Sequence, residues 1–137
     1  MASQLKVDTI TGVTTAGSIS VTGEGNSTTT NLQQGLAKAW ANIDETGTAS
    51  IRDSFNVSGI TDHATGDFSH AFSNVFGNVN HASSAASNAT LADNYNRNTS
   101  FLEALSASSI RHKSSSANDN GVEDQEAVMV TTFGDLA

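Results

Sequence analysis

Four histidines are the side chains of this sequence best suited to metal binding: His63, His70, His81 and His112. Neutral imidazole is a common metal ligand, and a trimer can hold one ion on its threefold axis through one histidine from each copy. His70 is the candidate for such an axial ligand, because it alternates with Phe68 and Phe72 along a predicted strand. That setting is more typical of a histidine that is buried or lines an interface. We therefore expect no metal and no other cofactor.

Three aspartates are the candidates for acid–base chemistry: Asp53, Asp62 and Asp67. Two carboxylates on either side of a glycosidic bond can hydrolyse a polysaccharide. Asp62 and Asp67, however, flank a predicted turn, where aspartate is common because its side chain accepts hydrogen bonds from nearby backbone amides. The sequence also lacks the glycine-rich nucleotide-binding motifs and the Gly-x-Ser-x-Gly motif of hydrolases. We expect a protein that is not an enzyme, and a small polysaccharide-degrading module is the less favoured alternative.

The chain has one tryptophan and one tyrosine. Trp40 could stack on a sugar ring, but between Ala39 and Ala41 in a chain poor in aromatic residues it is predicted to be the main buried anchor of the core. Tyr95 stands in a polar segment of the composition that recurs in recognition loops. We predict a receptor-contact surface at Tyr95, Asn96, Arg97 and Asn98.

The elements that position these side chains are predicted to be short strands. Two pairs of alternating apolar residues predict two strands within residues 4–22, namely Leu5 with Val7 and Ile19 with Val21. Residues 23–30 are rich in Gly, Ser, Thr and Asn, which is typical of a linker. We interpret residues 1–30 as an attachment or intertwining segment followed by this linker.

Residues 31–137 are predicted to form the head domain. Leu32 and Leu36 have helical spacing, which predicts a helical turn that leads into a strand at residues 38–43. The alternation of Phe55 with Val57, and of Phe68 with His70 and Phe72, predicts a β-hairpin around a turn at residues 63–66. Further strands are predicted at residues 79–82, 100–102, 110–113 and 127–133, and exposed loops at residues 83–92 and 114–124. Short strands at this spacing predict an antiparallel β-sandwich.

Composition indicates that one copy of the chain buries little apolar surface. Of its 137 residues only 36% are hydrophobic and 6% aromatic, and it has no cysteine that could form a disulfide. Small domains of this kind usually depend on other subunits for stability. We therefore expect an oligomer.

Charge and the distribution of apolar residues disfavour two classes of partner. The formal net charge is -8, which disfavours nucleic-acid binding because contacts to phosphates require lysine and arginine. No run approaches the roughly 20 apolar residues of a membrane span, and the start of the sequence has no apolar core of signal-peptide length. We expect no nucleic acid as a partner and no insertion into a membrane.

Several short motifs, in this order, resemble a module that is repeated in tail-fibre proteins of marine bacteriophages, including those of cyanobacteria and pelagic bacteria. The motifs are LKVDTI at residues 5–10, GLAKAW at 35–40, DSFNVS at 53–58, ITD at 60–62, GDF at 66–68 and VMVTTFG at 128–134. Together they span most of the chain. In that family the proteins are virion components, usually homotrimeric, with a sandwich-like head and an attachment segment.

The resemblance implies a bacteriophage structural protein on the outside of the virion, a tail fibre or similar appendage that takes part in host attachment. The expected fold is all-β: a homotrimer in which residues 1–30 attach or intertwine and residues 31–137 form an antiparallel β-sandwich-like head. The expected partners are identical copies, other tail or capsid proteins, and a host surface glycan or protein. A capsid decoration or head-fibre protein is the first alternative.

Overall fold

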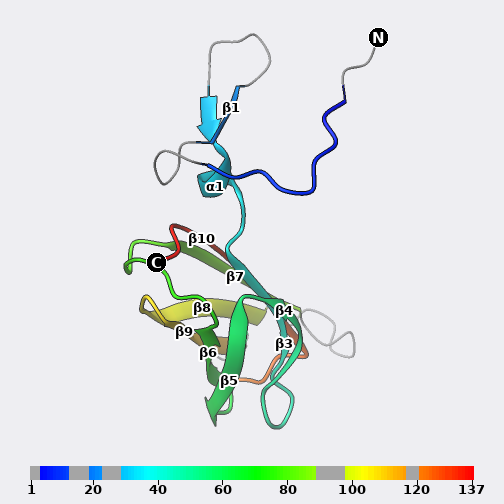
Figure 1. Cartoon of the computed structure of the whole chain (residues 1–137). Helices are drawn as coiled ribbons and strands as arrows, with labels where there is room; N and C mark the ends of the chain where they lie inside the picture. The colour runs from blue at the N-terminus through cyan, green and yellow to red at the C-terminus, as the bar shows by residue number, and fades with distance from the viewer. Residues whose placement is uncertain (1–3, 13–18, 23–28, 89–97, 117–120) are drawn as a thin grey trace. The chain divides into compact units, whose positions relative to one another are not determined.

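The computed structural model describes residues 4–12, 19–22, 29–88, 98–116 and 121–137, and the chain divides into two compact units, Met1–Leu36 and Ala37–Ala137 (Figure 1). The boundary expected at residue 30 lies inside the first unit. The regular secondary structure of the described residues is β, apart from one helical turn. No helix in this part of the chain is long and apolar enough to cross a membrane.

The first unit contains one small β-hairpin. Strand β1 (Ser20–Thr22) pairs antiparallel with β2 (Thr29–Asn31), and the single turn α1 (Leu32–Gly35) follows directly. The predicted helical turn is thus confirmed, and so is a strand around Val21. The predicted linker is wrong at its end, because Thr29 and Thr30 belong to β2. The strand predicted at Leu5 is not formed, because residues 4–12 belong to no strand.

The second unit consists of two four-stranded antiparallel sheets, which confirms the predicted antiparallel β-sandwich. The first, called here the β3 sheet, has the order β4-β3-β10-β7, with β3 at Ala39–Asp44, β4 at Ser50–Phe55, β7 at Ala82–Asn88 and β10 at Ala127–Phe133. The second, the β6 sheet, has the order β5-β6-β9-β8, with β5 at Val57–Ala64, β6 at Asp67–Phe72, β8 at Asn98–Leu105 and β9 at Ser109–Ser116.

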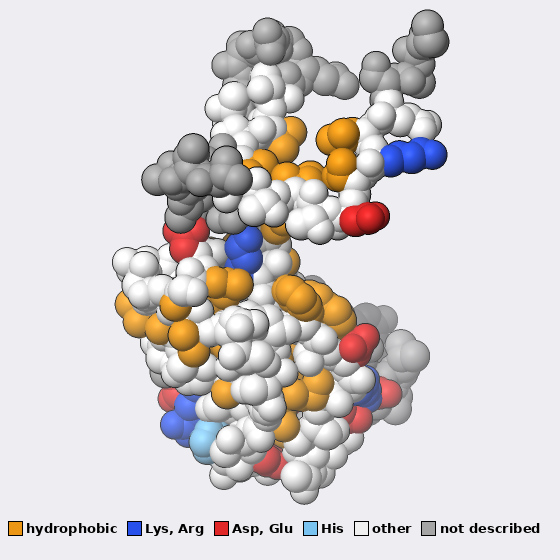
Figure 2. Space-filling model, in the orientation of Figure 1, with side chains coloured by type: hydrophobic (Ala, Val, Ile, Leu, Met, Phe, Trp, Pro, Cys, Tyr) orange, Lys and Arg blue, Asp and Glu red, His pale blue; other side chains and the backbone are white. Residues whose placement is uncertain are grey.

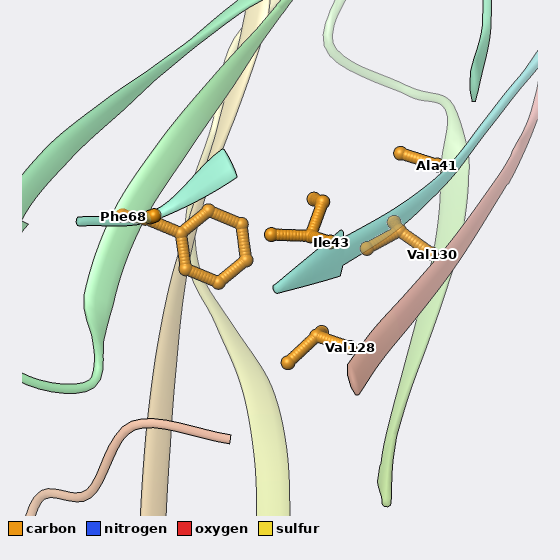
Figure 3. Packing of buried hydrophobic residues seen from close by; sticks show 6 residues of the cluster. Ala41, Ile43, Phe68, Val128 and Val130 are labelled. Carbon is orange, nitrogen blue, oxygen red and sulfur yellow. The ribbon is translucent and has the colours of Figure 1, made fainter. Parts of the chain in front are cut away.

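The core lies between the two sheets and follows from the period-2 alternation of their strands. Along β6, Phe68, His70 and Phe72 share one face, as predicted, and all three are buried. Phe68 points from β6 toward the facing strands β3 and β10 (Figure 3). There it packs against a cluster of small and branched side chains, namely Ala41, Ile43, Ala49, Val128 and Val130. A second cluster comprises Ala39, Phe72, Phe76 and Ile110.

Trp40 does not belong to this core, which corrects the prediction that it is the main buried anchor. Its neighbours Ala39 and Ala41 are 1% and 3% exposed, whereas Trp40 is 38% exposed. Successive residues of a strand point to opposite faces, so Trp40 must point outward when both alanines point inward. The large apolar residues of the core are Phe68, Phe72 and Phe76, which are 1%, 5% and 2% exposed.

Asn56 is the single residue between β4, which belongs to the β3 sheet, and β5, which belongs to the β6 sheet. Its φ angle is 58°, in the left-handed region that asparagine tolerates better than most residues. Its side chain donates to the backbone oxygens of Lys38 and Asn74, both at 3.0 Å, and accepts a 2.7 Å hydrogen bond from the backbone N–H of Asn74. This corner separates Phe55 from Val57, which the sequence placed in one strand.

The loop predicted at residues 83–92 is wrong over the part that the structure describes. Strand β7 pairs with β10 over seven consecutive positions, from Ala82 opposite Phe133 to Asn88 opposite Ala127. Alanine and serine have weak strand preferences, so the pairing is decided by the neighbouring strand and not by local sequence. The strand predicted at residues 79–82 contributes only Ala82, the first residue of β7. The strands predicted at residues 110–113 and 127–133 are confirmed as β9 and β10. The exposed loop predicted at residues 114–124 is wrong at its start, because β9 continues to Ser116 and Ser114 is buried.

Candidate functional site

The outer face of the β6 sheet carries a group of charged and hydroxyl side chains. Asp67 and Ser69 on β6 stand opposite Lys113 and Arg111 on β9. These residues point away from the core because the residues that alternate with them are buried. The sheet thus presents an apolar inner face and a polar outer face.

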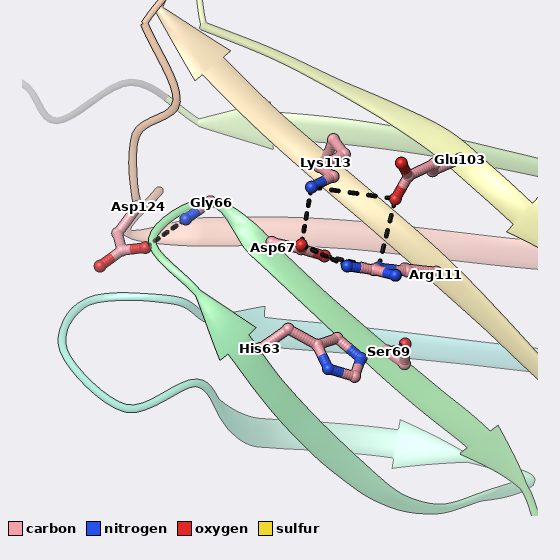
Figure 4. Close-up of polar contacts among 8 residues, drawn as sticks. All are labelled: His63, Gly66, Asp67, Ser69, Glu103, Arg111, Lys113 and Asp124. Atoms are coloured by element: carbon pink, nitrogen blue, oxygen red, sulfur yellow. Dashed lines mark hydrogen bonds and ion pairs between the residues drawn. The ribbon is translucent and has the colours of Figure 1, made fainter.

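Asp67 lies at the centre of an ionic network on this face (Figure 4). Arg111 donates to both of its carboxylate oxygens, at 2.8 Å from Nε and 2.6 Å from Nη2, and Lys113 Nζ donates at 2.6 Å. Hydrogen bonding from Arg111 and then from Lys113 holds the pKa of Asp67 far below its usual range. Glu103, on β8, lies 3.2 Å from Arg111 Nε and 3.9 Å from Lys113 Nζ. Two carboxylates and two cations therefore balance one another and fix the Arg111 guanidinium in place.

A shallow groove of about 280 Å³ runs beside this network. Its lining combines one apolar side chain with five that carry hydrogen-bonding groups, namely Leu105 with His63, Ser69, Ser106, Ser109 and Arg111. His63 Nε2 lies 2.8 Å from Ser69 Oγ, which fixes the imidazole against the sheet (Figure 4). Ser106 Oγ accepts hydrogen bonds from the backbone amides of Ser108 and Ser109, so the turn between β8 and β9 is held by its own side chain.

The side chains that line the groove can form hydrogen bonds with the hydroxyl groups of a ligand. Its serine and imidazole groups can donate or accept hydrogen bonds, its guanidinium group can donate them, and Leu105 offers an apolar surface for the C–H groups of a sugar ring. Ser69 and His63 resemble the first two members of a hydrolytic triad. A triad also needs a carboxylate that orients the histidine, and among the described residues no carboxylate is hydrogen-bonded to His63.

The tight turn between β5 and β6 positions one end of this face. Gly66 has a φ angle of 61°, and its backbone N–H donates to Asp124 Oδ1 at 2.7 Å (Figure 4). Its backbone oxygen accepts a 2.8 Å hydrogen bond from the N–H of Ser114 on β9. A side-chain carbon at Gly66 would lie 2.6 Å from the oxygen of Ser114, so only glycine fits. The turn thus ties three segments together and sets the start of β6.

Beneath the same sheet, two histidines form a buried pair. His112 Nε2 lies 2.9 Å from His70 Nδ1, and the two rings are stacked with centroids 4.9 Å apart. Phe68 stacks on His112 from the other side, at 4.7 Å. Burial, and then the nearby His81, lower the pKa of His70 to about 4, and burial together with His70 lowers the pKa of His112 to about 3. Both rings are therefore neutral at neutral pH.

Glu45 is a buried carboxylate near the end of β3. Its two oxygens accept hydrogen bonds from Ser114 Oγ at 3.0 Å and from the backbone N–H of Gln125 at 2.8 Å. Burial raises the pKa of Glu45 to about 6, although these two hydrogen bonds act in the opposite direction. The side chain links three segments that are far apart in sequence, so its role is structural.

The candidate residues chosen from sequence are dispersed. Tyr95, Asn96 and Arg97 lie outside the described residues, and Asn98 is the first residue of β8. His70 is 1% exposed, inside the sandwich. In the described part of the chain, no three histidine or carboxylate side chains are arranged to hold a metal ion.

The three aspartates considered for hydrolysis do not form one site. Asp53 lies on β4 of the β3 sheet, whereas Asp67 is held on the outer face of the β6 sheet. Asp62 accepts a 3.0 Å hydrogen bond from the backbone N–H of Ala49, which stabilises the loop after β3. Sequence reasoning missed the groove residues Ser106 and Arg111, although alternation along residues 109–113 already separates Arg111 from the buried Ile110 and His112.

No family model, no curated protein and no solved structure matches the chain.

Proposed function

We propose that the chain is a non-enzymatic attachment module on the outside of a bacteriophage particle, a tail fibre or similar appendage. In this proposal the first unit joins copies to one another and to the particle, and the sandwich contacts the host. The motifs that resemble marine phage tail-fibre modules support the virion assignment. The structural observation that carries the proposal is the contrast between the two units.

That contrast lies in how each unit buries apolar side chains. In the described part of the first unit no residue is buried, and Leu5, Val7, Ile10, Val21 and Leu36 are between 52% and 81% exposed. The sandwich has two apolar clusters of its own. Apolar side chains without a core are stabilised by burial against another chain. A homotrimer with intertwined first units provides that burial, and residues 4–12 have no strand partner to lose when they join it.

The groove on the β6 sheet is the proposed host-contact site, and a saccharide unit of a host surface glycan is its proposed ligand. Its hydrogen-bonding side chains match sugar hydroxyls, and its size is suited to about one sugar ring. One such contact is weak. Three copies in an appendage, and several appendages on a particle, bind far more tightly than one, because each further contact becomes intramolecular.

The position of the protein in the virion is tested with an antibody against the purified chain. Immunogold electron microscopy of particles from the source phage is expected to place gold on the tail. Labelling of the capsid would support the decoration-protein alternative and contradict the tail assignment. Particles without label would overturn the virion proposal altogether.

The groove is tested by screening the full-length protein on an array of defined bacterial oligosaccharides and lipopolysaccharides. We expect binding by the wild type and a loss of about tenfold or more in Leu105→Arg, whose long charged side chain fills the groove. Val79→Arg is the matched control, because Val79 is also an exposed apolar residue, at 55%, and does not line the groove. Equal binding by both variants, or no binding by the wild type, would contradict the site.

A further inference from the structure

The outer face of the β3 sheet carries a group of large apolar side chains that nothing in the chain's own sandwich covers. Trp40 on β3 stands opposite Phe55 on β4, and on its other side opposite Thr131 on β10. Met129 and Phe133 lie two residues before and after Thr131 and so share its face. The exposed fractions are 38% for Trp40, 54% for Phe55, 45% for Met129 and 38% for Phe133. These four residues are called here the Trp40 patch.

We infer that the Trp40 patch is the surface through which the sandwiches of identical copies contact one another. This inference rests on the oligomer in the proposed function and goes beyond it by naming the surface that the head contributes. Figure 2 shows hydrophobic side chains at several places on the surface of the protein, between polar ones. The Trp40 patch differs from scattered apolar residues because the strand register places its members next to one another.

The side chains around the patch favour a protein surface over a sugar. Each patch residue lies in a row of directly paired residues that runs across the strands of the sheet. The other members of these rows are Thr131, Asn42, Asp53 and the β7 residues Ala82, Ser84 and Ala86. Trp, Phe and Met are enriched in the cores of protein interfaces, and charged residues are depleted there. Asp53 is the one charged residue in these rows, all of which the structure describes. The phenyl rings and the thioether beside Trp40 offer sugar hydroxyls no more than one weak hydrogen-bond acceptor.

The size of the patch indicates which protein covers it. Side chains of this kind have about 200 Å² of surface each, so the four leave roughly 350 Å² of apolar surface in water. A stable interface between freely diffusing proteins needs about 800 Å² from each partner. The patch is therefore too small to hold a free partner tightly. It suffices for copies that are already tethered through their first units, because tethering raises the effective concentration of one head near another to about the millimolar range.

The distribution of charge also supports the outer face of the β3 sheet as the surface through which copies contact one another. Each copy carries a net charge of -8, so two heads repel one another wherever their carboxylates approach. The rows of the patch contain one carboxylate, Asp53, and the next carboxylate on this face of β3, Asp44, is paired with Arg52 at 2.7 Å, so the repulsion there is small. The β6 sheet, with its ionic network and polar groove, is left free for the host contact.

The test uses the full-length protein and two readouts, native mass and the accessibility of Trp40. Trp40 is the chain's one tryptophan, so quenching of its fluorescence by acrylamide reports on this face alone. We expect a wild-type trimer in which the quenching constant is about threefold lower than in the variants Met129→Glu and Phe133→Glu, since those variants expose the ring. Both substituted side chains point outward, and far-ultraviolet circular dichroism checks that the sandwich is folded.

Val79→Glu is the matched control, because it makes the same change of charge at an exposed valine outside the patch. The quenching constant of Trp40 in this variant is expected to equal that of the wild type. A wild-type trimer whose Trp40 is as accessible as in Met129→Glu would overturn this inference and leave the proposed trimer intact. A monomeric wild type would overturn the trimer itself, and the inference with it.

Discussion

His70 and His112 are polar residues in the place where a sandwich normally buries aliphatic side chains. Their rings are 1% and 0% exposed and bind one another instead of water. A neutral imidazole pair of this kind is compatible with the core because one nitrogen donates and the other accepts. A protonated pair is not compatible, because both nitrogens would then be donors and the charge would lie away from water.

We predict that the sandwich loses stability in acid through these two histidines. Their folded-state pKa values, about 4 and about 3, lie below the ordinary value of 6.5, so the stability they contribute is present above 6.5 and is lost as the pH falls toward 4. Each group changes the free energy of unfolding by up to about 1.4 kcal/mol per pH unit in this window. Urea unfolding at several pH values gives the free energy of unfolding of the wild type and of the double variant His70→Leu/His112→Leu. The free energy of the double variant should depend less on pH. Equal slopes would contradict the assignment.

The effect of Glu45 on stability changes with pH in the direction opposite to that of the two histidines. Its removal is therefore predicted to make the loss of stability in acid steeper. Its pKa of about 6 lies above the ordinary value of 4.5, so its stabilising contribution is present below 4.5 and is lost as the pH rises through 6. In Glu45→Gln this opposing change is absent, and urea unfolding should show a steeper loss between pH 6 and 4.5. Glu126→Gln, at an exposed carboxylate, is the control and should keep the wild-type slope.

Trp40 shows what sequence could and could not tell at the scale of single residues. The alternation of Ala39, Ala41 and Ile43 was visible in the sequence, and it already placed Trp40 on the opposite face. The prediction of a buried anchor followed the size and hydrophobicity of tryptophan instead of the strand period. Periodicity was the better guide, because a strand cannot turn one side chain inward between two neighbours that also point inward.

Individual strands were predictable where large apolar residues alternate with polar ones. The sequence located β3, β6, β9 and β10: β6 shows this alternation most clearly, and the other three have β-branched residues at buried positions, namely Ile43, Ile110 and Val130. Strand β7 does not have it, since its residues are alanine, serine and asparagine, and its pairing with β10 is a tertiary effect. The corner at Asn56 was equally hidden, because it depends on contacts with Lys38 and Asn74, each 18 residues away.

Three glycines, two in turns and one in a strand, allow a graded test of how much an added side-chain carbon lowers the free energy of unfolding. Gly59→Ala should change the free energy of unfolding little, because a Cβ there meets nothing within 4 Å and no positive φ must be kept. Gly47→Ala meets nothing either but has a φ of 74°, so it should cost about 1 kcal/mol of backbone strain. Gly66→Ala combines a φ of 61° with the 2.6 Å contact to Ser114 and should cost roughly 3 kcal/mol or more.

Chemical denaturation of the three variants under one condition gives the ranking. A Gly66→Ala variant as stable as Gly59→Ala would show that the turn between β5 and β6 can move without cost, and that it does not fix the start of β6.

At the scale of the whole molecule, composition predicted an oligomer from the scarcity of apolar residues. The structure shows where burial of side chains is lacking. The described part of residues 1–36 has no buried residue, whereas the sandwich has two apolar clusters. Composition is an average over the chain and cannot locate such a division. The three groove serines and Arg111 were likewise not predictable from composition, because the groove forms only when β5, β6, β8 and β9 are brought together.

The net charge of the chain leads to a prediction about salt. Copies with a charge of -8 repel one another, and salt screens this repulsion over a Debye length of about 10 Å at 0.1 M. Self-association of the full-length protein is therefore expected to become stronger between about 20 mM and 200 mM sodium chloride. Sedimentation velocity at a series of concentrations measures it. Weaker association at the higher salt would indicate that ion pairs, and not apolar side chains, hold the copies together.

The entry point of the chain into the sandwich has a mechanical consequence. Residues 37 and 38 lead directly into β3, which is an inner strand of its sheet, hydrogen-bonded to β4 on one side and to β10 on the other. If, as proposed, the sandwich binds a host surface while the first unit is held by the particle, tension along β3 is shared by the two hydrogen-bond ladders that flank it. A strand at an edge would peel away one bond at a time under the same load, so this connection suits a tether that must withstand shear.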